Sequence, residues 1–577
     1  MERSARVQCS RRSASPGRFF VLNISNAVVS GSPVFASQEI ATLAKGAGHL
    51  AAWRSLIETG GKDFSSLVRE VSGDFSVGFV DEVGRTLLAV DRFSIRSLCY
   101  RLVDGELRFA ARADQLADST SEVDPQAIFD YLYFHVIPSP RTIFKDIFRL
   151  PPGHCAIFEN GSLSVLPYWV PEFSELAKPS FVDLRAEFRL LLRDAVVRQL
   201  DSGKPGCFLS GGTDSSTVAG MIGEVSGESA ATYSIGFQAE GYDEMEYARI
   251  AARHFKTEHH EYYVTPDDLL HSIPSVAQCY DQPFGNSSAL PAYYCAKMAR
   301  EDGISKILAG DGGDELFGGN TRYAKQRVFG YYDSVPRIFR NTVLEPMLLK
   351  TPLGRLPVAR KGASYIEQAK VPLPDRNQIY NMLYRLGVNQ VFNRDFLAGV
   401  DVDDPIRQQR VVWNTALAES QTNRELAFDW RYTLAECDLP KVVETTALAG
   451  IKVGFPMLDY GLVDFSTKLP TSYKLKGLNL RWFFKEALRG FLPDEILAKK
   501  KQGFGLPFGV WAAKNARLRS LAEDSVRGLV DRNILRGDFV DVLFSRHLHD
   551  HPGYYGEMIW IGMMLEQWLR RDLAVDP

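Results

Sequence analysis

The sequence predicts an α/β protein in which a domain of antiparallel strands precedes a domain built on a parallel sheet. Three observations support this prediction. A glycine-rich turn at 210–212 stands between an apolar strand and a helix. After it, apolar runs of strand length alternate with helical patterns as far as residue 309, which is typical of a parallel sheet with crossover helices. Before it, residues 72–92 alternate apolar and polar side chains, which indicates half-buried antiparallel strands.

The N-terminal region is expected to form a domain of its own, residues 1–172. Its clearest strands are predicted at 72–80 and 87–92. This pattern ends at 168–171, and a helix is predicted soon afterwards, from residue 181 to residue 200. We therefore place the second domain at residues 173–577.

The second domain is expected to begin with the parallel sheet. Its first strand, 206–209, leads into the glycine-rich turn and then into a helix that begins near Ser215. Acidic residues open the helical pattern at 243–252, where the helix dipole favours them. A last helix around 560–571 is expected to pack against this domain. Further strands are predicted at 231–237, 259–264 and 305–309, and a further helix at 290–300.

The turn after the first parallel strand is predicted to bind an anion. Between a strand and a helix, its backbone N–H groups point outward at the positive end of the helix dipole. Gly211 and Gly212 have no side chains to keep phosphate oxygens from the backbone. Ser210 and Ser215 add hydroxyl donors, and Asp214 offers a carboxylate to a divalent cation on the same phosphates. An ordinary strand–turn–helix connection is the alternative, and the turn lacks the Gly-Lys-Ser/Thr of a Walker A loop.

A second glycine-rich segment, Gly310–Gly319, follows the strand at 305–309 directly. Ligands of such sheets bind outside the carboxyl ends of the strands. This segment and the first turn are therefore expected to face the same ligand. Glycines interleaved with acids such as Asp311 and Asp314 suit a loop that brings carboxylates close to a Mg²⁺-bound pyrophosphate.

Together, the two segments resemble the asparagine synthetase family, in its class B, glutamine-dependent type. The first segment resembles the pyrophosphate-binding loop of ATP pyrophosphatases. The resemblance implies a degenerate Ntn-hydrolase-like αββα domain, followed by an ATP-pyrophosphatase (HUP-like) synthetase domain with a helical C-terminal part. It extends from about residue 65 to the C-terminal region through Asp281–Pro283, Phe455–Asp459 and Lys499–Pro507.

One further segment, Val136–Lys145, resembles homologues linked to exopolysaccharide and exosortase systems. This likeness hints at amidation of a sugar acid, so that a small-molecule or glycan carboxylate is the expected substrate.

The resemblance also implies ATP and Mg²⁺ as cofactors and gives individual residues their roles. Asp214 and Asp314 resemble the Mg²⁺ ligands. Asp311 stands where a carboxylate would receive a proton from the attacking amine. The implied catalytic residues are Asp311, Arg481 and Lys485, and the implied ATP-binding residues are Phe208, Leu209, Ser210, Gly211, Gly212, Asp214, Ser215, Ile235, Gly310 and Lys500.

Two positions depart from the family pattern. The family's catalytic lysine aligns with Arg481, which does not donate a proton at neutral pH but can hold phosphate oxygens bidentately. Either Arg481 keeps the charge-stabilising role or Lys485 on the same helix replaces it; the alternative is that both are solvated cations. The second departure is Ile451–Pro456, which lacks the Glu and Arg of Leu-Glu-x-Arg-x-Pro and so weakens any assignment of aspartate as substrate.

The N-terminal region lacks the residues of a working glutaminase of this family. Such an enzyme needs Cys as the mature N-terminal residue, because the thiol attacks and the free amine acts as base. Residue 2 is Glu2, and Cys9 lies in a polar segment that does not read as a strand. The glutamine-binding segments are missing, and Asp91–Tyr100 lacks the usual Gly and Pro. We therefore expect a structural domain that caps the sheet, and formation of a homodimer stays open. The nitrogen would then come from free ammonia, another subunit or the substrate itself.

Composition excludes several classes of protein. The net charge of −3 gives no global footprint for nucleic acid. Seven scattered cysteines fit reduced thiols of a cytoplasmic protein better than a disulfide framework. No apolar run is long enough to span a bilayer, and the basic, Ser-rich N-terminus lacks the apolar core of a secretory signal.

The expected function is that of an ATP-dependent carbon–nitrogen ligase. It would adenylate a carboxylate, release pyrophosphate and form an amide with ammonia or another amine. Two alternatives stay open: an intramolecular amide-forming cyclase of the β-lactam synthetase or lasso cyclase type, and a non-catalytic protein that binds nucleotide.

Overall fold

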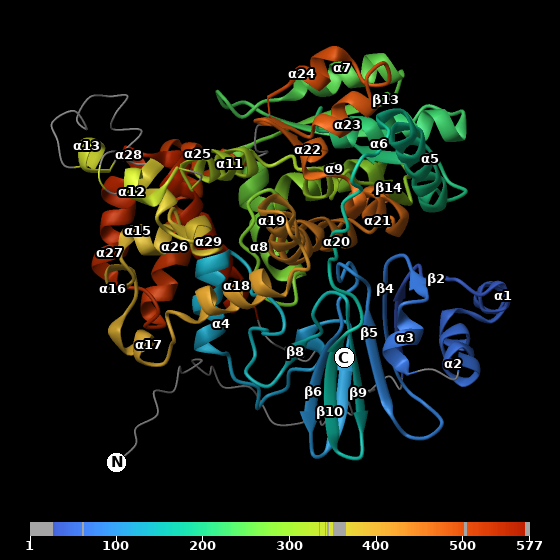
Figure 1. Ribbon diagram of the computed structural model, residues 1–577. Helices are drawn as coiled ribbons and strands as arrows, with labels where there is room; N and C mark the ends of the chain where they lie inside the picture. Colours follow the sequence, from blue (N-terminus) through green and yellow to red (C-terminus); the bar gives the residue numbers. More distant parts are fainter. Residues whose placement is uncertain are drawn as a thin grey trace.

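The chain forms an N-terminal domain of antiparallel sheets and a second domain on a parallel sheet, with a helical part that completes the second domain (Figure 1). The computed structural model describes residues 27–60, 63–333, 335–340, 342, 345–349, 365–500 and 505–571. The predictions that concern Glu2, Cys9 and Lys501 lie outside these residues.

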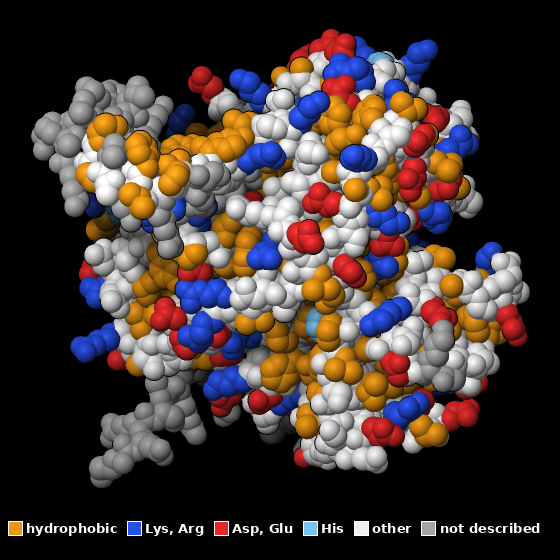
Figure 2. Space-filling model, in the orientation of Figure 1, with side chains coloured by type: hydrophobic (Ala, Val, Ile, Leu, Met, Phe, Trp, Pro, Cys, Tyr) orange, Lys and Arg blue, Asp and Glu red, His pale blue; other side chains and the backbone are white. Residues whose placement is uncertain are grey.

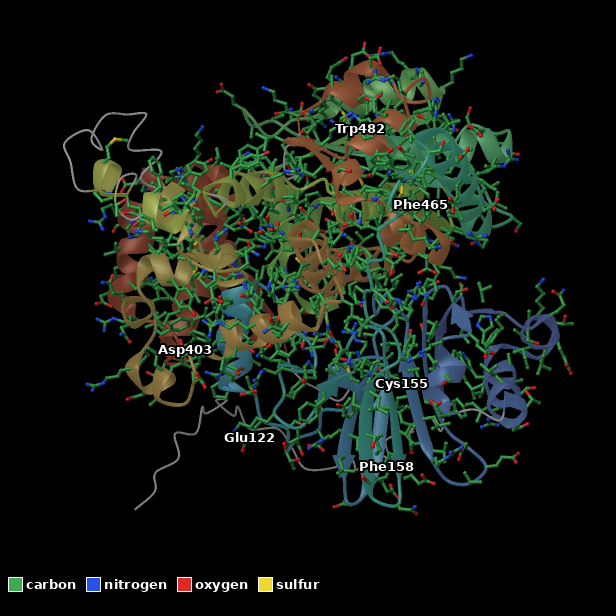
Figure 3. The ribbon with its side chains drawn as sticks, viewed as in Figure 1. Glu122, Cys155, Phe158, Asp403, Phe465 and Trp482 are labelled. Atoms are coloured by element: carbon green, nitrogen blue, oxygen red, sulfur yellow. The ribbon has the colours of Figure 1, made fainter. Side chains whose placement is uncertain are left out.

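The N-terminal domain stacks a helical layer on two antiparallel sheets. The larger sheet has the order β1-β4-β5-β9-β10 and the smaller one β7-β6-β8. Because successive residues of a strand point to opposite faces, β9 serves two cores: Cys155 packs with the helices and Phe158 with the second sheet (Figure 3). The elements are β1 (Ala27–Gly31), β2 (Val34–Phe35), α1 (Gln38–Ala47), α2 (His49–Gly60), α3 (Phe64–Val68), β3 (Val71–Ser72), β4 (Phe75–Val80), β5 (Thr86–Val90), β6 (Cys99–Val103), β7 (Glu106–Ala110), α4 (Pro125–Phe134), β8 (Phe148–Arg149), β9 (His154–Glu159) and β10 (Ser162–Pro167).

The second domain is built on a five-stranded parallel sheet in the order β13-β12-β11-β14-β15. The central strand places Cys207 opposite Thr232 on one side and Leu308 on the other. Four of the strands match the predicted ones. The fifth, β15, was not predicted; it has three residues and no glycine-rich loop follows it to mark a strand end. The strands are β11 (Gly206–Phe208), β12 (Ala231–Phe237), β13 (Glu258–Val264), β14 (Lys306–Leu308) and β15 (Lys452–Gly454).

Helices cover both faces of this sheet. The helices α5, α6 and α7 pack against one another over one face, and α8, α9 and α20 do so over the other. They are α5 (Phe181–Gln199), α6 (Thr213–Ser226), α7 (Met245–Phe255), α8 (Pro266–Cys279), α9 (Ala289–Glu301) and α20 (Leu439–Leu448).

The helical part predicted for the C-terminal region is present and lies beside the parallel sheet (Figure 1). Its last helix, α29, packs against α8, α25 and α26. The remaining elements are α10 (Gly313–Phe317), α11 (Thr321–Asp333), α12 (Arg337–Phe339), α13 (Glu345–Leu349), α15 (Met382–Leu386), α16 (Val388–Val391), α17 (Arg394–Ala398), α18 (Asp404–Thr415), α19 (Gln421–Asp429), a π-helical segment (Trp430–Asp438), α21 (Tyr460–Lys468), α22 (Thr471–Lys474), β16 (Leu475–Lys476), β17 (Asn479–Leu480), α23 (Trp482–Ala487), α24 (Asp494–Ala498), α25 (Phe508–Lys514), α26 (Ala516–Asp531), α27 (Gly537–Val542), a second π-helical segment (Leu543–His547), α28 (Leu548–Asp550) and α29 (Pro552–Leu569).

An aromatic cluster fixes α23 against the rest of the second domain. Phe188 of α5 contacts the rings of Phe317, Phe465, Phe483 and Phe484, with centroids 5.3–6.0 Å apart. Phe465, labelled in Figure 3, belongs to α21, and the last two rings belong to α23. Buried aromatic pairs add packing energy beyond the area they bury. The cluster therefore holds the helix that begins directly after Arg481.

The two domains meet through ionic and aromatic contacts. The Arg92 guanidinium lies 3.9 Å from the ring centroid of Tyr460 and pairs with Asp464 at 2.6 Å. The predicted boundary between residues 172 and 173 falls between β10 and α5.

The described surface carries charges of both signs, and the described cysteines form no disulfides. On the face shown in Figure 2, Lys and Arg side chains are interspersed with Asp and Glu, among separate apolar patches. The six cysteines in the described ranges are all free. No helix in the described part of the chain has the length and apolarity needed to cross a membrane.

Candidate functional site

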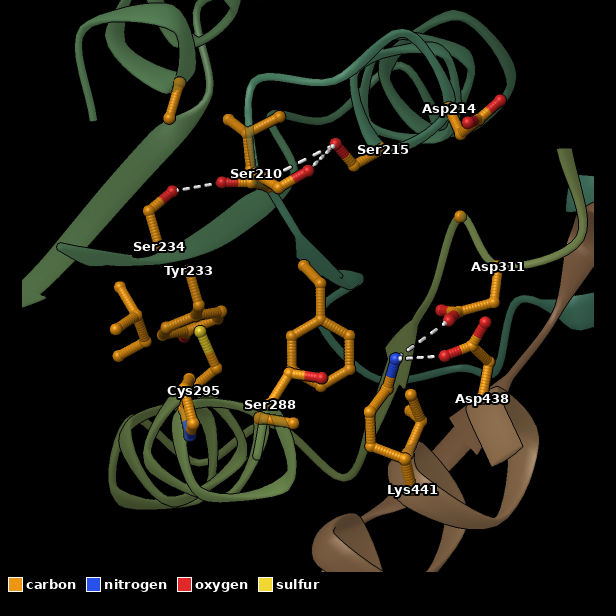
Figure 4. Close-up of a pocket in the computed structure, with 18 of the residues that line it drawn as sticks. Ser210, Asp214, Ser215, Tyr233, Ser234, Ser288, Cys295, Asp311, Asp438 and Lys441 are labelled. Atoms are coloured by element: carbon orange, nitrogen blue, oxygen red, sulfur yellow. Dashed lines mark hydrogen bonds and ion pairs between the residues drawn. The ribbon is translucent and has the colours of Figure 1, made fainter. Parts of the chain in front are cut away.

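The two predicted loops meet at the carboxyl ends of the parallel strands. One follows β11, in the middle of the sheet, and the other follows the neighbouring β14. The chain order reverses between these strands, which is where open α/β sheets bind ligands. A cavity of about 440 Å³ opens there, and residues of both loops line it (Figure 4).

The first loop presents an open helix N-terminus to the cavity. The Ser210 N–H donates to Ser215 Oγ at 3.2 Å, and the two hydroxyls lie 3.1 Å apart. Gly211 has a φ of +66°, which favours glycine. Gly212 precedes α6, and no side chain caps that helix. A Cβ at Gly212 would meet only Ser210 Oγ, at 3.3 Å, so its backbone is open to a ligand. The loop therefore fits the phosphates of ATP.

Strand β12 holds this loop in place through two hydrogen bonds to Leu209. The Leu209 N–H donates to the Tyr233 carbonyl at 2.9 Å, and the Ser234 hydroxyl donates to the Leu209 carbonyl. Phe208 and Ile235 line the same part of the cavity. Strand β11, which leads into the loop, and its neighbour β12 thus fix the position of the loop that would hold ATP.

We expect Ser234→Ala to weaken ATP binding without unfolding the protein. The change leaves the Leu209 carbonyl without its hydroxyl donor, and such a loss costs about 1–3 kcal/mol. The dissociation constant for ATP should rise by about tenfold, measured by titration calorimetry. Ser226→Ala is the matched control, because that hydroxyl bonds the Ile222 carbonyl at the far end of α6. An unchanged affinity in Ser234→Ala would contradict the prediction.

Glycines in the second loop let carboxylates approach closely. A Cβ at Gly313 would lie 2.0 Å from Asp214 Oδ1, and one at Gly319 would lie 1.7 Å from Asp314 Oδ1. A Cβ at Gly310 would lie 2.7 Å from the Ser215 nitrogen, so the two loops touch. The spacing of glycines and acids in the sequence is therefore a steric requirement of the fold.

Arg481 joins the two carboxylates predicted to bind Mg²⁺. Its guanidinium bonds both oxygens of Asp214, bonds Asp314 at 2.7 Å and donates to Thr213 Oγ1 at 2.7 Å. It also lies 4.2 Å from the ring centroid of Phe484. The residue is only 5% exposed. Burial lowers the pKa of Arg481, but the two carboxylates raise it above its ordinary value.

Asp214 and Asp314 fit Mg²⁺, which usually binds through one or two carboxylates together with phosphates and water. Both are oxygen donors within reach of one cation, here the guanidinium of Arg481. In the described ranges no group of three or more His, Cys, Asp or Glu side chains is arranged to hold a metal ion. These two residues would therefore hold Mg²⁺ jointly with the phosphates of a nucleotide.

A second cavity, of about 770 Å³, lies on the other side of the first loop. Lys485 and Lys500 line it. Burial, and then the charge of Arg481, lowers the pKa of Lys485. Lys499 opens the predicted basic segment Lys499–Pro507 but was not among the residues predicted to bind ATP. Its Nζ lies 3.3 Å from the Gly211 carbonyl and 3.2 Å from a Glu244 carboxylate oxygen.

Asp311 also lines the first cavity, directly after Gly310 and beside two residues that the sequence did not single out. Lys441 Nζ lies 3.7 Å from Asp311 Oδ1 and 3.0 Å from Asp438 Oδ1 (Figure 4). Burial raises the pKa of Asp311 and the Lys441 charge opposes that rise. The only sequence signal was an Asp and a Lys three residues apart in an apolar stretch around Pro440.

The structure brings all but one of the predicted residues together in two groups. Gly211 lines neither cavity, although Lys499 Nζ lies 3.3 Å from its carbonyl. Those that line the first cavity are Phe208, Leu209, Ser210, Asp214, Ser215, Ile235, Gly310, Asp311 and Asp314. Those that line the second cavity are Ser210, Gly212, Asp214, Ser215, Asp314, Arg481, Lys485 and Lys500. Their catalytic and binding roles stay predictions.

In the N-terminal domain, the segment that departs from the family pattern folds around a buried carboxylate. Asp91 accepts the N–H groups of Phe93, Ile95 and Arg96 at 3.0–3.2 Å. Burial raises its pKa to about 7. Ser94 adopts a φ of +51°, in the region that favours glycine, where the family pattern has glycine. This carboxylate supports a turn.

Comparison with known proteins agrees with both domains. The asparagine synthase family matches residues 187–570, and the glutamine amidotransferase domain family matches residues 55–169. Glutamine-hydrolyzing asparagine synthetase 1 of Bacillus subtilis (strain 168) is 25% identical over 492 residues, 83% of this chain and 74% of that protein. Glutamine-hydrolyzing asparagine synthetase 3 of the same organism is 26% identical over 458 residues, 76% of this chain and 68% of that protein.

Among solved structures, NMN synthetase from Francisella tularensis aligns with 44% of this chain and 94% of its own, at 15% identity and a TM-score of 0.21. The family match itself covers most of the chain, including both glycine-rich loops and Arg481. The chain belongs to the asparagine synthase family, whose members are ATP-dependent, amide-forming ligases.

Proposed function

We propose that this ligase activates a carboxylate as an acyl-adenylate, releases pyrophosphate and forms an amide by attack of ammonia or another amine. One observation carries the proposal. A single cavity joins the open N-terminus of α6, which suits phosphates, to the Asp311 carboxylate, which suits an amine. Both halves of the reaction therefore have matching groups in one cavity.

The two cavities divide the parts of ATP between them. The first cavity, with Phe208 and Ile235, would receive the adenosine and the activated carboxylate. The second, with Arg481, Lys485 and Lys499, would receive the departing pyrophosphate. Fixed N–H donors and cations stabilise the charge that develops on phosphate oxygens. Mg²⁺, held by Asp214 and Asp314, would supply further charge neutralisation to the pyrophosphate.

The nitrogen source is proposed to be independent of a glutaminase in this chain. Asp91 is enclosed by backbone N–H donors in the described residues, and the glutamine-binding segments of the family are missing from the sequence. Free ammonia or an organic amine would then enter the cavity directly. A sugar acid or another small carboxylate is the proposed acyl substrate.

One assay tests this function and its alternatives. Pyrophosphate release would be measured with ATP and Mg²⁺ across a panel of sugar acids and other carboxylates, with ammonia, with glutamine or with no added amine. Release with ammonia and an amide product supports the proposal. Amide formation without added amine indicates an intramolecular cyclase. Equal support by ammonia-free glutamine overturns the claim of an inactive glutaminase, and ATP binding without any release indicates a non-catalytic protein.

A further inference from the structure

The peptide between Gly211 and Gly212 decides which of its groups the phosphate loop presents to a ligand. In a trans peptide the carbonyl oxygen and the N–H point in opposite directions. Glycine stands on both sides of this peptide, and because glycine adopts both signs of φ readily, the local sequence does not fix which way the peptide faces. A flipped peptide would turn its carbonyl oxygen, and not its N–H, toward a phosphate. A contact from outside the loop is therefore needed to hold the orientation that suits ATP.

Lys499 makes this contact. Its Nζ donates to the Gly211 carbonyl oxygen at 3.3 Å. Because that carbonyl is turned toward the ammonium, the Gly212 N–H points away from it, and its partner is Ser210 Oγ at 3.4 Å. So long a hydrogen bond is weak, which leaves the N–H for a stronger, charged acceptor such as a phosphate oxygen. Lys499 can therefore act on a phosphate through the backbone of the loop.

The beginning of α7 holds Lys499 in turn. Its Nζ lies 3.2 Å from Glu244 Oε2 and 4.4 Å from the ring centroid of Tyr247. The side chains of Lys499 and Glu244 are each only 10% exposed. Among the described residues, Glu244 forms no ion pair with any other cation. Solvent and salt screen a pair buried to this degree only weakly, so Glu244 keeps the ammonium beside the loop.

The phosphate loop packs directly on this part of α7. A Cβ at Gly211 would lie 2.4 Å from the Ala248 nitrogen and 2.5 Å from the Tyr247 carbonyl carbon. Glu244 lines both cavities and therefore lies where they meet. A carboxylate at this place repels the oxygens of a bound phosphate. Its presence is explained if the hold that it exerts on Lys499 outweighs the repulsion.

We propose that Lys499, held by Glu244, is a positioning residue that fixes the peptide between Gly211 and Gly212 with its N–H presented to a phosphate of ATP. The carboxylate holds the lysine, and the lysine holds the peptide. This inference rests on the proposed function, in which the loop binds the phosphates of ATP, and it names two residues that make the loop ready for them.

Glu244→Gln separates positioning from direct attraction, because the two predict opposite signs. If Lys499 attracted phosphate by its charge alone, removing the Glu244 charge would tighten ATP binding. If Lys499 acts through the Gly211 carbonyl, a looser hold on the lysine should weaken ATP binding, by about three- to tenfold. Titration calorimetry of the full-length protein with ATP and Mg²⁺ measures the sign.

Two changes at Lys499 complete the test. Lys499→Met removes the donor to the Gly211 carbonyl and should weaken ATP binding by at least about tenfold. Lys499→Arg keeps a charged donor and should stay within about threefold of the natural protein. Adenosine has no phosphates and should bind every variant within about twofold of the natural affinity. A parallel loss of adenosine binding would assign the effect to general damage of the site and overturn the inference.

The matched control is Glu246→Gln, which removes the same charge from the same end of α7. The Glu246 side chain is 65% exposed and pairs with Arg253 at 3.0 Å on the surface. It lies outside the lining of both cavities. Exposed pairs of this kind contribute little, so ATP affinity should change by no more than about twofold.

Tighter or unchanged ATP binding in Glu244→Gln overturns the inference, and so does natural affinity in Lys499→Met. The pyrophosphate assay is a separate measurement, because ATP binding does not depend on the acyl substrate. If no carboxylate supports pyrophosphate release while both variants weaken ATP binding, the proposed reaction fails and the positioning role stands. If release occurs and Glu244→Gln binds ATP more tightly, only the inference fails.

Discussion

Replacing Arg481 with methionine is expected to lower both activity and stability strongly. The guanidinium is buried and bonds Asp214, Asp314 and Thr213. Removing one partner of a buried ion pair leaves uncompensated charge and costs about 3–5 kcal/mol. The loss of a fixed donor to phosphate oxygens should reduce kcat/KM for pyrophosphate release by about 10²–10³-fold. Scanning calorimetry and the pyrophosphate assay measure the two effects.

The same variant should also respond more strongly to Mg²⁺. Without the guanidinium, Arg481 no longer competes with Mg²⁺ for Asp214 and Asp314, and a ligand that binds only the folded state raises its stability. We therefore expect Mg²⁺ alone to raise the melting temperature of Arg481→Met more than that of the natural protein. This readout does not depend on catalysis.

Arg489→Met is the matched control for Arg481. Arg489 is 58% exposed at its side chain and pairs with Glu486 at 2.8 Å on the surface. Exposed pairs of this kind contribute about 0–1 kcal/mol. If Arg481→Met keeps activity within about threefold of the natural protein, Lys485 carries the phosphate contacts instead. In that case Lys485→Met, and not Arg481→Met, should abolish pyrophosphate release.

The two glycine-rich loops were predictable because their chemistry is local. Backbone exposure at Gly212 and close carboxylate approach at Gly313 and Gly319 each depend on a missing side chain. A missing side chain is visible directly in the sequence. The parallel strands were predictable for two reasons. Strands β12 and β13 are seven residues long each, and the shorter β11 and β14 are each followed by one of the glycine-rich loops.

Contacts between distant segments were not predictable in this way. Arg481 lies 267 residues after Asp214 and 167 after Asp314, and no local pattern states that one guanidinium joins them. Lys441 meets Asp311 only because α20 packs against the sheet beside β15. Resemblance to a family aligned Arg481 with a catalytic position. Its role as a partner of the expected Mg²⁺ ligands required the fold.

Replacing Asp311 with asparagine is expected to separate the two halves of the reaction. Asparagine keeps the shape of the side chain but does not accept a proton from the amine. General-base catalysis contributes about 10²–10⁴-fold to such a step, so amide formation should fall by that factor. Carboxylate-dependent exchange of pyrophosphate into ATP should stay within about threefold, because Asp311 forms its ion pair with Lys441 and not with a residue of the phosphate loop.

The pH dependence gives an independent check on Asp311. Burial raises the pKa of this carboxyl above its ordinary value of 3.8. Only the deprotonated form accepts a proton, so amide formation should be present above the raised pKa and be lost as the pH falls through it. Asp311→Asn should lose this acidic limb, and Glu444→Gln, a change on α20 outside the lining of this cavity, should keep it. If Asp311→Asn retains both the rate of amide formation and the acidic limb of its pH profile, the proton acceptor is instead Asp438, the other carboxylate that faces Lys441.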